Sequence, residues 1–168
     1  TCPGIELTPS SMAGLNNIAL ETSGFWIEID PDNGQRITSG LSMGYGTAFV
    51  TKERSCYALY GDSMANIQRQ KISDNGNVGM RALAFCEGLA FWADWQNHTF
   101  CTWGPDSGFK DVGQPVADIM KNITLADALN MCINYHDRRA HISYKLNSVW
   151  EWMEYDFRTG TWYDQNGQ

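Results

Sequence analysis

Seven tryptophans within 168 residues constrain the fold of this chain more than any other feature. Each indole buries on the order of 200 Å² in a core, so a few of them largely fix where that core lies. Charged residues make up only 18% of the chain, and this low charge, together with the many aromatic residues, argues against disorder. Because the length is typical of one folding unit, we expect a single globular domain over residues 1–168.

Short runs of β-branched and aromatic residues, separated by turn residues, predict most of the secondary structure. The sequence Pro31-Asp32-Asn33-Gly34 is a strong turn, since proline presets φ and glycine accepts a positive φ. It predicts a hairpin between the two runs that flank it. The expected strands cover residues 24–30, 35–41, 47–51, 55–60, 67–72, 99–103, 141–146, 149–157 and 161–164.

The segment 78–95 fits two different structures. As a helix it would be apolar on both faces and therefore buried, and its alanine content favours this interpretation. The same residues also fit two strands that are divided at Glu87-Gly88. We expect the helix and keep the two strands as the alternative.

Two other segments are expected to be helical, 12–20 and 124–135. Thr124 is a suitable N-cap for the second helix, and Asp127 stands at the capping-box position. The apolar stripe of that helix would be Leu125, Ala128, Leu129 and Cys132. Strands on either side of a central helical region indicate an α+β fold, with a mainly antiparallel β-sheet packed against one or two α-helices.

Five widely spaced cysteines predict a disulfide-stabilised protein outside the reducing cytosol. None of them forms a C-x-x-C pair, so a zinc ribbon or a thioredoxin-like site is not supported. We expect two long-range disulfides, with the odd cysteine left as a free thiol or an intermolecular link. The alternative is five buried thiols in a cytosolic protein. The five residues are Cys2, Cys56, Cys86, Cys101 and Cys132.

Charge limits the possible partners. The net charge is −7 with only 12 lysines and arginines, which argues against nucleic acid and against an anionic membrane surface. No stretch approaches the roughly 20 apolar residues of a membrane helix, and we expect no metal or cofactor. Asn97 and Asn122 begin glycosylation sequons, which predict N-linked sugars in a secreted chain.

Histidines and carboxylates near the C-terminus suggest acid–base chemistry as one alternative. His136 and His141 are the histidine pair closest in sequence, and an imidazole moves protons near neutral pH. Glu154 and Asp156 follow on one expected strand, where alternate residues point to the same side. These four residues are the candidate catalytic groups of a small secreted hydrolase.

Aromatic residues crowd the same C-terminal hairpin and suggest a binding role. If one row of rings is exposed, it forms a stacking platform for a sugar or an anchor for a protein partner. The candidate binding residues are Trp150, Trp152, Trp162 and Tyr163. Gln96, Asn97 and His98, beside Trp92, Trp95 and Trp103, form a second and weaker candidate of the same kind.

In size, charge and cysteine usage the chain resembles the small secreted proteins that pathogens, especially fungi, release toward their hosts. This resemblance implies a non-enzymatic interaction protein, an effector, virulence factor or toxin-like domain that binds a host protein or a glycan. The hydrolase with a histidine–carboxylate pair is the alternative. The first hypothesis rests on the cysteines, the aromatic residues and the lack of a coherent catalytic set.

Overall fold

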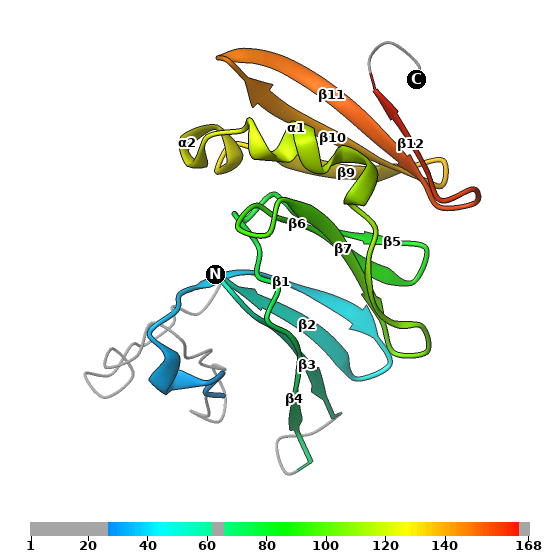
Figure 1. The fold of residues 1–168 in the computed structure, drawn as a ribbon. Helices are drawn as coiled ribbons and strands as arrows, with labels where there is room; N and C mark the ends of the chain where they lie inside the picture. Colours follow the sequence, from blue (N-terminus) through cyan, green and yellow to red (C-terminus); the bar gives the residue numbers. More distant parts are fainter. Residues whose placement is uncertain (1–26, 62–65, 165–168) are drawn as a thin grey trace, which may run out of the picture.

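The computed structural model describes residues 27–61 and 66–164, and in these ranges the chain forms three four-stranded antiparallel sheets (Figure 1). Each sheet consists of four strands that follow one another in the sequence. The helix expected at 12–20, the start of the strand expected at 24–30, and Cys2 lie outside the described residues.

The strands are short and joined mostly by tight turns. The first sheet contains β1 (Ile37–Gly44), β2 (Thr47–Lys52), β3 (Cys56–Tyr60) and β4 (Gln68–Ser73). The second contains β5 (Leu83–Cys86), β6 (Leu89–Asp94), β7 (Thr99–Gly104) and β8 (Gly108–Asp111). The third contains β9 (Cys132–His136), β10 (Arg139–Leu146), β11 (Val149–Asp156) and β12 (Thr161–Asp164).

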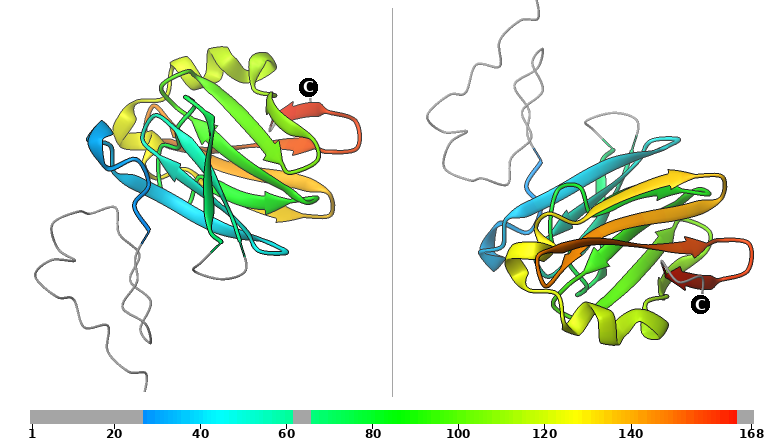
Figure 2. Two further views of the ribbon diagram at one scale, coloured as in Figure 1. Left: turned by 90° about the horizontal axis from the view of Figure 1, so that it is seen from below. Right: turned by 90° about the horizontal axis from the view of Figure 1, so that it is seen from above.

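Helical structure in the described residues is limited to short pieces. A 3-10 turn, η2 (Pro31–Asn33), precedes the first sheet. The connection from the second sheet to the third contains η3 (Gln114–Val116), α1 (Ala117–Lys121) and α2 (Leu125–Ala128). These elements lie along one side of the sheets (Figure 2). The expected α+β class is therefore wrong, because the protein is built mainly from antiparallel β-sheet.

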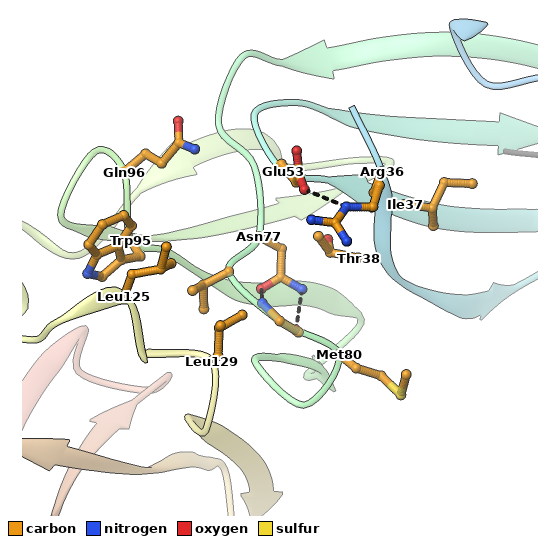
Figure 3. A pocket seen from close by; sticks show the side chains of 12 residues that line it. Arg36, Ile37, Thr38, Glu53, Asn77, Met80, Trp95, Gln96, Leu125 and Leu129 are labelled. Atoms are coloured by element: carbon orange, nitrogen blue, oxygen red, sulfur yellow. Dashed lines mark hydrogen bonds and ion pairs between the residues drawn. The ribbon is translucent and has the colours of Figure 1, made fainter. Parts of the chain in front are cut away.

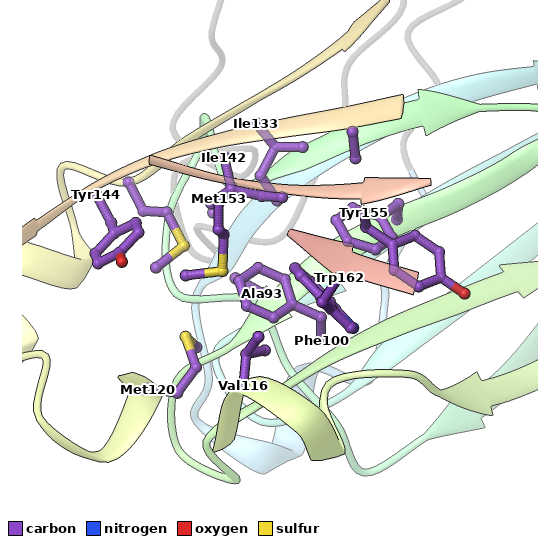
Figure 4. Close-up of a cluster of buried hydrophobic side chains, with 14 of the residues drawn as sticks. Ala93, Phe100, Val116, Met120, Ile133, Ile142, Tyr144, Met153, Tyr155 and Trp162 are labelled. Carbon is purple, nitrogen blue, oxygen red and sulfur yellow. The ribbon is translucent and has the colours of Figure 1, made fainter. Parts of the chain in front are cut away.

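The second sheet is covered on both faces. Along β6, Phe91 and Ala93 belong to the core shared with the third sheet, which Figure 4 shows, while Ala90 and Trp92 belong to the core shared with the first sheet. A strand with two buried faces is apolar at every position and has no alternation. The helix expected at 78–95 is wrong for this reason, and the alternative division at Glu87-Gly88 matches β5 and β6.

The first strands of successive sheets, β1, β5 and β9, lie next to one another. The backbone N–H of Ile133 donates to the carbonyl of Arg81 at 2.9 Å, and Ser39 Oγ donates to the carbonyl of Met80 at 3.1 Å. Four-stranded meanders that pack face to face, with their first strands adjacent, are arranged like consecutive blades of a β-propeller.

The hairpin expected between 24–30 and 35–41 does not form in the described residues, because the segment before β1 packs across the first sheet instead. Lys52 is completely buried, and its Nζ donates to the carbonyls of Ile29 at 2.8 Å and Asp30 at 2.9 Å, and to Asn33 Oδ1 at 2.8 Å. Tyr57 Oη donates to Asp30 Oδ2 at 2.6 Å. These contacts fix the segment over the outer side of the first sheet.

The helix expected at 124–135 ends after its first turn. Thr124 does cap α2, since its Oγ1 accepts the backbone N–H of Asp127 at 3.2 Å. Residues Cys132–His136 then form β9 and pair with β10, so that Ile133 enters the core. A local capping signal sets where a helix begins, but strand pairing decides where this one stops.

The predicted disulfides are also wrong. Cys56, Cys86, Cys101 and Cys132 are all free thiols, and the first three are buried. Burial raises the pKa of Cys56 and of Cys86 to about 12 and that of Cys101 further, which keeps these thiols protonated and inert. The expectation of an extracellular effector or toxin-like protein loses the bridges on which it relied.

Candidate binding face

The third sheet buries one face and leaves the other open. Residues Ile142, Tyr144, Met153 and Tyr155 enter the core, so the alternate residues of β9 to β12 lie on the opposite side. We call this side the outer face. It contains Cys132, Asn134, His136, Arg139, His141, Ser143, Lys145, Trp150, Trp152, Glu154, Asp156, Thr161 and Tyr163.

Two-residue turns set the register of this face. Asp137 and Arg138 have φ of 47° and 62° between β9 and β10, and Asn147 and Ser148 have φ of 51° and 66° between β10 and β11. Positive φ at both central positions is the geometry of a turn that matches the twist of its strands. As a result, His141 lies opposite Glu154 across β10 and β11.

Two tryptophans dominate one end of the outer face. Trp150 is 56% exposed and Trp152 is 45% exposed, although indoles usually lose most of their accessible surface on folding. They are two residues apart on β11, so their Cα atoms are about 7 Å apart along the strand. Lys145 Nζ lies 5.1 Å from the centre of the Trp150 ring, which is within cation–π range.

A network of charged side chains continues the face beyond Trp152. Glu154 accepts from Arg139 Nη1 at 3.0 Å through one carboxylate oxygen, and its other oxygen lies 3.0 Å from His141 Nδ1. The guanidinium of Arg139 also lies over the ring of Tyr163, at 5.6 Å from its centre. These contacts hold four polar groups in fixed positions beside the tryptophans.

Asp156 closes the far end of this network. Its carboxylate accepts from Arg158 Nη2 at 3.0 Å and from the backbone N–H of Arg158 at 2.8 Å, and Arg139 Nε lies 3.4 Å away. The hydrogen bonds from Arg158 hold the pKa of Asp156 well below its usual range. Only 2% of the side chain is exposed, so this carboxylate has a structural role rather than a chemical one.

His136 lies at the edge of the outer face, on β9. It is exposed, and its ring centre lies 6.5 Å from that of His141. Across the described ranges, no group of three or more histidine, cysteine or acidic side chains could hold a metal ion. Nor does any helix there have the length and apolar character needed to cross a membrane.

Of the eight candidate residues from the sequence, the structure places seven on the outer face. The exception is Trp162, which is buried, donates from Nε1 to the carbonyl of Val112 at 2.7 Å, and packs against Phe100 (Figure 4). Adjacent residues on a strand point to opposite sides, so Trp162 and Tyr163 could not share a face. Sequence reasoning missed Arg139 and Lys145, which alternate with the core residues of β10.

The two sequon asparagines lie away from the outer face. Asn97 is exposed in the turn between β6 and β7, where its Nδ2 donates to Asp94 Oδ2 at 2.6 Å. Asn122 is exposed at the end of α1, where its Nδ2 donates to the carbonyl of Asp118 at 2.8 Å. Glycosylation at these positions stays a prediction.

The chain matches no protein-family model, and the comparison with curated proteins finds no match either.

Proposed function

We propose that this chain is a non-enzymatic carbohydrate-binding module whose ligand site is the outer face of the third sheet. The observation that carries this proposal is the pair of exposed rings, Trp150 and Trp152, on one rigid strand. The apolar face of a sugar ring stacks on an indole, and rings carried on alternate residues of one paired strand lose little entropy on binding.

The polar network supplies the other half of sugar recognition. Hydroxyl groups need both donors and acceptors, and Arg139, His141 and Glu154 offer both further along the same face as Trp152. Because these side chains already hold one another, a sugar hydroxyl can replace water on them without reorganising the site.

The composition of the face favours a glycan over a protein partner. Protein interfaces are depleted in glutamate and aspartate at their centre, whereas here Glu154, paired with Arg139, lies two residues after Trp152 on the same face. A protein partner would have to desolvate these charges, which is costly. Sugar hydroxyls instead hydrogen-bond to them.

A hydrolase is the second candidate, and it rests on the 3.0 Å separation between His141 Nδ1 and Glu154 Oε1. Such a pair could move a proton, but a glycosidase of the usual kind needs two accessible carboxylates. Asp156, the second carboxylate of the face, is enclosed by arginines. Binding without turnover is therefore the better-supported function.

The test is a glycan array followed by calorimetry on the glycans that bind. Replacing either ring, in Trp150→Ala or Trp152→Ala, should weaken binding about tenfold, the loss expected for one stacking contact of ~1.4 kcal/mol. Tyr45→Ala is the matched control, because Tyr45 is fully exposed on the hairpin between β1 and β2. It should bind as the unsubstituted protein does.

Three results would count against this function. The proposal fails if no glycan binds, or if Tyr45→Ala loses as much affinity as the tryptophan variants. Cleavage of a bound glycan during incubation, abolished by His141→Gln, would establish the hydrolase instead.

A further inference from the structure

A pocket of about 590 Å³ lies away from the outer face, in the size range of small-molecule sites (Figure 3). Five segments contribute to it: the start of β1, the turn between β2 and β3, the loop before β5, the turn between β6 and β7, and α2. Its lining includes Arg36, Glu53, Asn77, Trp95, Leu125 and Leu129. The pocket shares no residue with the proposed carbohydrate site.

One wall of the pocket is apolar. Trp95, Leu125 and Leu129 lie together there, with Met80 at the rim (Figure 3). Leu125 is 49% exposed, Leu129 is 58% exposed and Met80 is 79% exposed, and they are among the most exposed large apolar side chains in the described residues. Leu125 and Leu129 were expected to be buried in the core as part of an apolar helix stripe. Because both are exposed, they contribute little to the stability of the fold from where they lie. Exposed apolar side chains gathered at a pocket are typical of a ligand site.

The opposite wall presents a guanidinium. Arg36 uses Nε to donate to Glu53 Oε1 at 3.1 Å, and its two Nη groups have no hydrogen-bond acceptor among the described residues. Two parallel N–H groups suit the two oxygens of a carboxylate. The Arg36 side chain is 77% exposed, so the pair with Glu53 orients the guanidinium only weakly, and its Nη groups stay accessible to a ligand.

A fixed floor joins the two walls. Asn77 is buried, and its Nδ2 donates to the carbonyl of Gly79 at 2.9 Å while its backbone N–H donates to the carbonyl of Lys52 at 2.9 Å. These bonds hold the loop before β5 against the first sheet. The pocket is therefore held open by backbone contacts and not only by mobile side chains.

We propose that this pocket binds an amphipathic small molecule with an apolar body and a single carboxylate head. The body lies on Trp95, Leu125 and Leu129, and the head pairs with Arg36. An acidic head is assigned because Arg36 is the positively charged side chain in the lining of the pocket and its two Nη groups are accessible.

The test uses decanoate as the probe and decanol as its uncharged match. Decanoate should bind with a stoichiometry of one by calorimetry and should displace anilinonaphthalene sulfonate, a fluorescent amphiphile, in competition. Decanol should bind about tenfold more weakly, since it lacks the charged head. Arg36→Gln should weaken decanoate about tenfold and leave decanol unchanged.

The apolar wall is tested with Leu125→Gln/Leu129→Gln, which should weaken both probes at least about tenfold. Both leucines are exposed, so this variant should fold, as circular dichroism would confirm. Val149→Gln is the control, because Val149 is 60% exposed at the start of β11 and lies outside the pocket. Trp152→Ala should leave decanoate binding intact, which separates this site from the carbohydrate site.

The proposal is overturned if decanoate shows no saturable binding. It is also overturned if Val149→Gln weakens decanoate as much as the leucine variant does. Equal affinity for decanol and decanoate would disprove the acidic head and, with it, the assigned ligand class.

Discussion

His141 and Glu154 lie opposite each other on neighbouring strands, with Nδ1 of the imidazole 3.0 Å from Oε1 of the carboxylate. The same carboxylate accepts from Arg139 through its second oxygen. Glu154 is thus the centre of the polar network beside the exposed tryptophans. Removing its charge should affect the ligand site directly.

We expect Glu154→Gln to weaken glycan binding about tenfold, because an amide can accept only one of the two contacts and no longer holds Arg139 and His141 by charge. Calorimetry on a glycan identified by the array measures the change. Asp118→Asn is the matched control, since Asp118 pairs with Lys121 on α1 and is almost fully exposed. Unchanged affinity in Glu154→Gln would show that the polar network does not contribute to glycan binding.

Asp156 should make the free energy of unfolding depend on pH in the acidic range. Its pKa is lowered in the folded protein, chiefly by Arg158, whereas in the unfolded chain it titrates near its ordinary value of about 3.9. Its stabilising contribution is therefore fully present above that value and is lost as the pH falls below it.

Urea unfolding at several pH values measures this contribution. Asp156→Asn should be less stable than the unsubstituted protein at pH 7, and the difference should shrink as the pH falls toward 2. The exposed turn residue Asp106 provides the comparison, in Asp106→Asn. A stability difference that stays constant with pH would show that the charge of Asp156 does not contribute.

The four described cysteines should differ sharply in reactivity. Cys132 is partly exposed, whereas Cys56, Cys86 and Cys101 are buried. Iodoacetamide should therefore modify Cys132 in the native protein and the other three at least about a hundredfold more slowly, since their labelling requires an opening that costs ~3 kcal/mol or more. Mass spectrometry of digested protein measures each rate, with and without denaturant.

Protection of the three buried cysteines alone does not exclude a bridge, so the denatured sample must be alkylated without reductant. All four should then react. Failure of any two to react until a reductant is added would show a disulfide, contrary to the structure.

Lys52 should be essential to stability because its ammonium group is the shared donor for three acceptors in the segment before β1. Lys52→Met removes that donor and leaves the carbonyls of Ile29 and Asp30 without it. We expect a loss of ~2–4 kcal/mol in the free energy of unfolding. Urea denaturation gives the value.

Lys71→Met is the control for the loss of a lysine charge. Lys71 is half exposed on β4 and pairs with the exposed Asp74, so its replacement should change the free energy of unfolding by no more than about 0.5 kcal/mol. Equal effects in the two variants would contradict the anchoring role of Lys52.

The sequence predicted β10, β11 and β12 of the third sheet because alternation survives where the two faces of a strand differ, whereas β9 was expected to be helical. Along β10, Ile142 and Tyr144 enter the core while His141 and Ser143 do not. The second sheet has no such contrast, since Ala90 to Ala93 are buried without interruption. Periodicity alone cannot separate a strand buried on both faces from a buried helix.

The candidate site was predictable in part. Alternation along β11 predicts that Trp150, Trp152, Glu154 and Asp156 share a side, and the structure confirms this. Which side of the strand is open depends on where the other sheets pack, which is information that no local pattern contains. The pocket was unpredictable for the same reason, as Arg36 and Leu129 are far apart in the sequence.

The second sheet forms one wall of the core that it shares with the third sheet and one wall of the core that it shares with the first, while the first sheet also packs on the segment before β1 through a smaller cluster. The chain completes its three meanders one after another, so most strand pairings are local and quick to form. The stability of each sheet nevertheless depends on its neighbours. A meander that separates from the stack uncovers aromatic side chains on its neighbour, so the three units are distinct in topology but inseparable in thermodynamic terms.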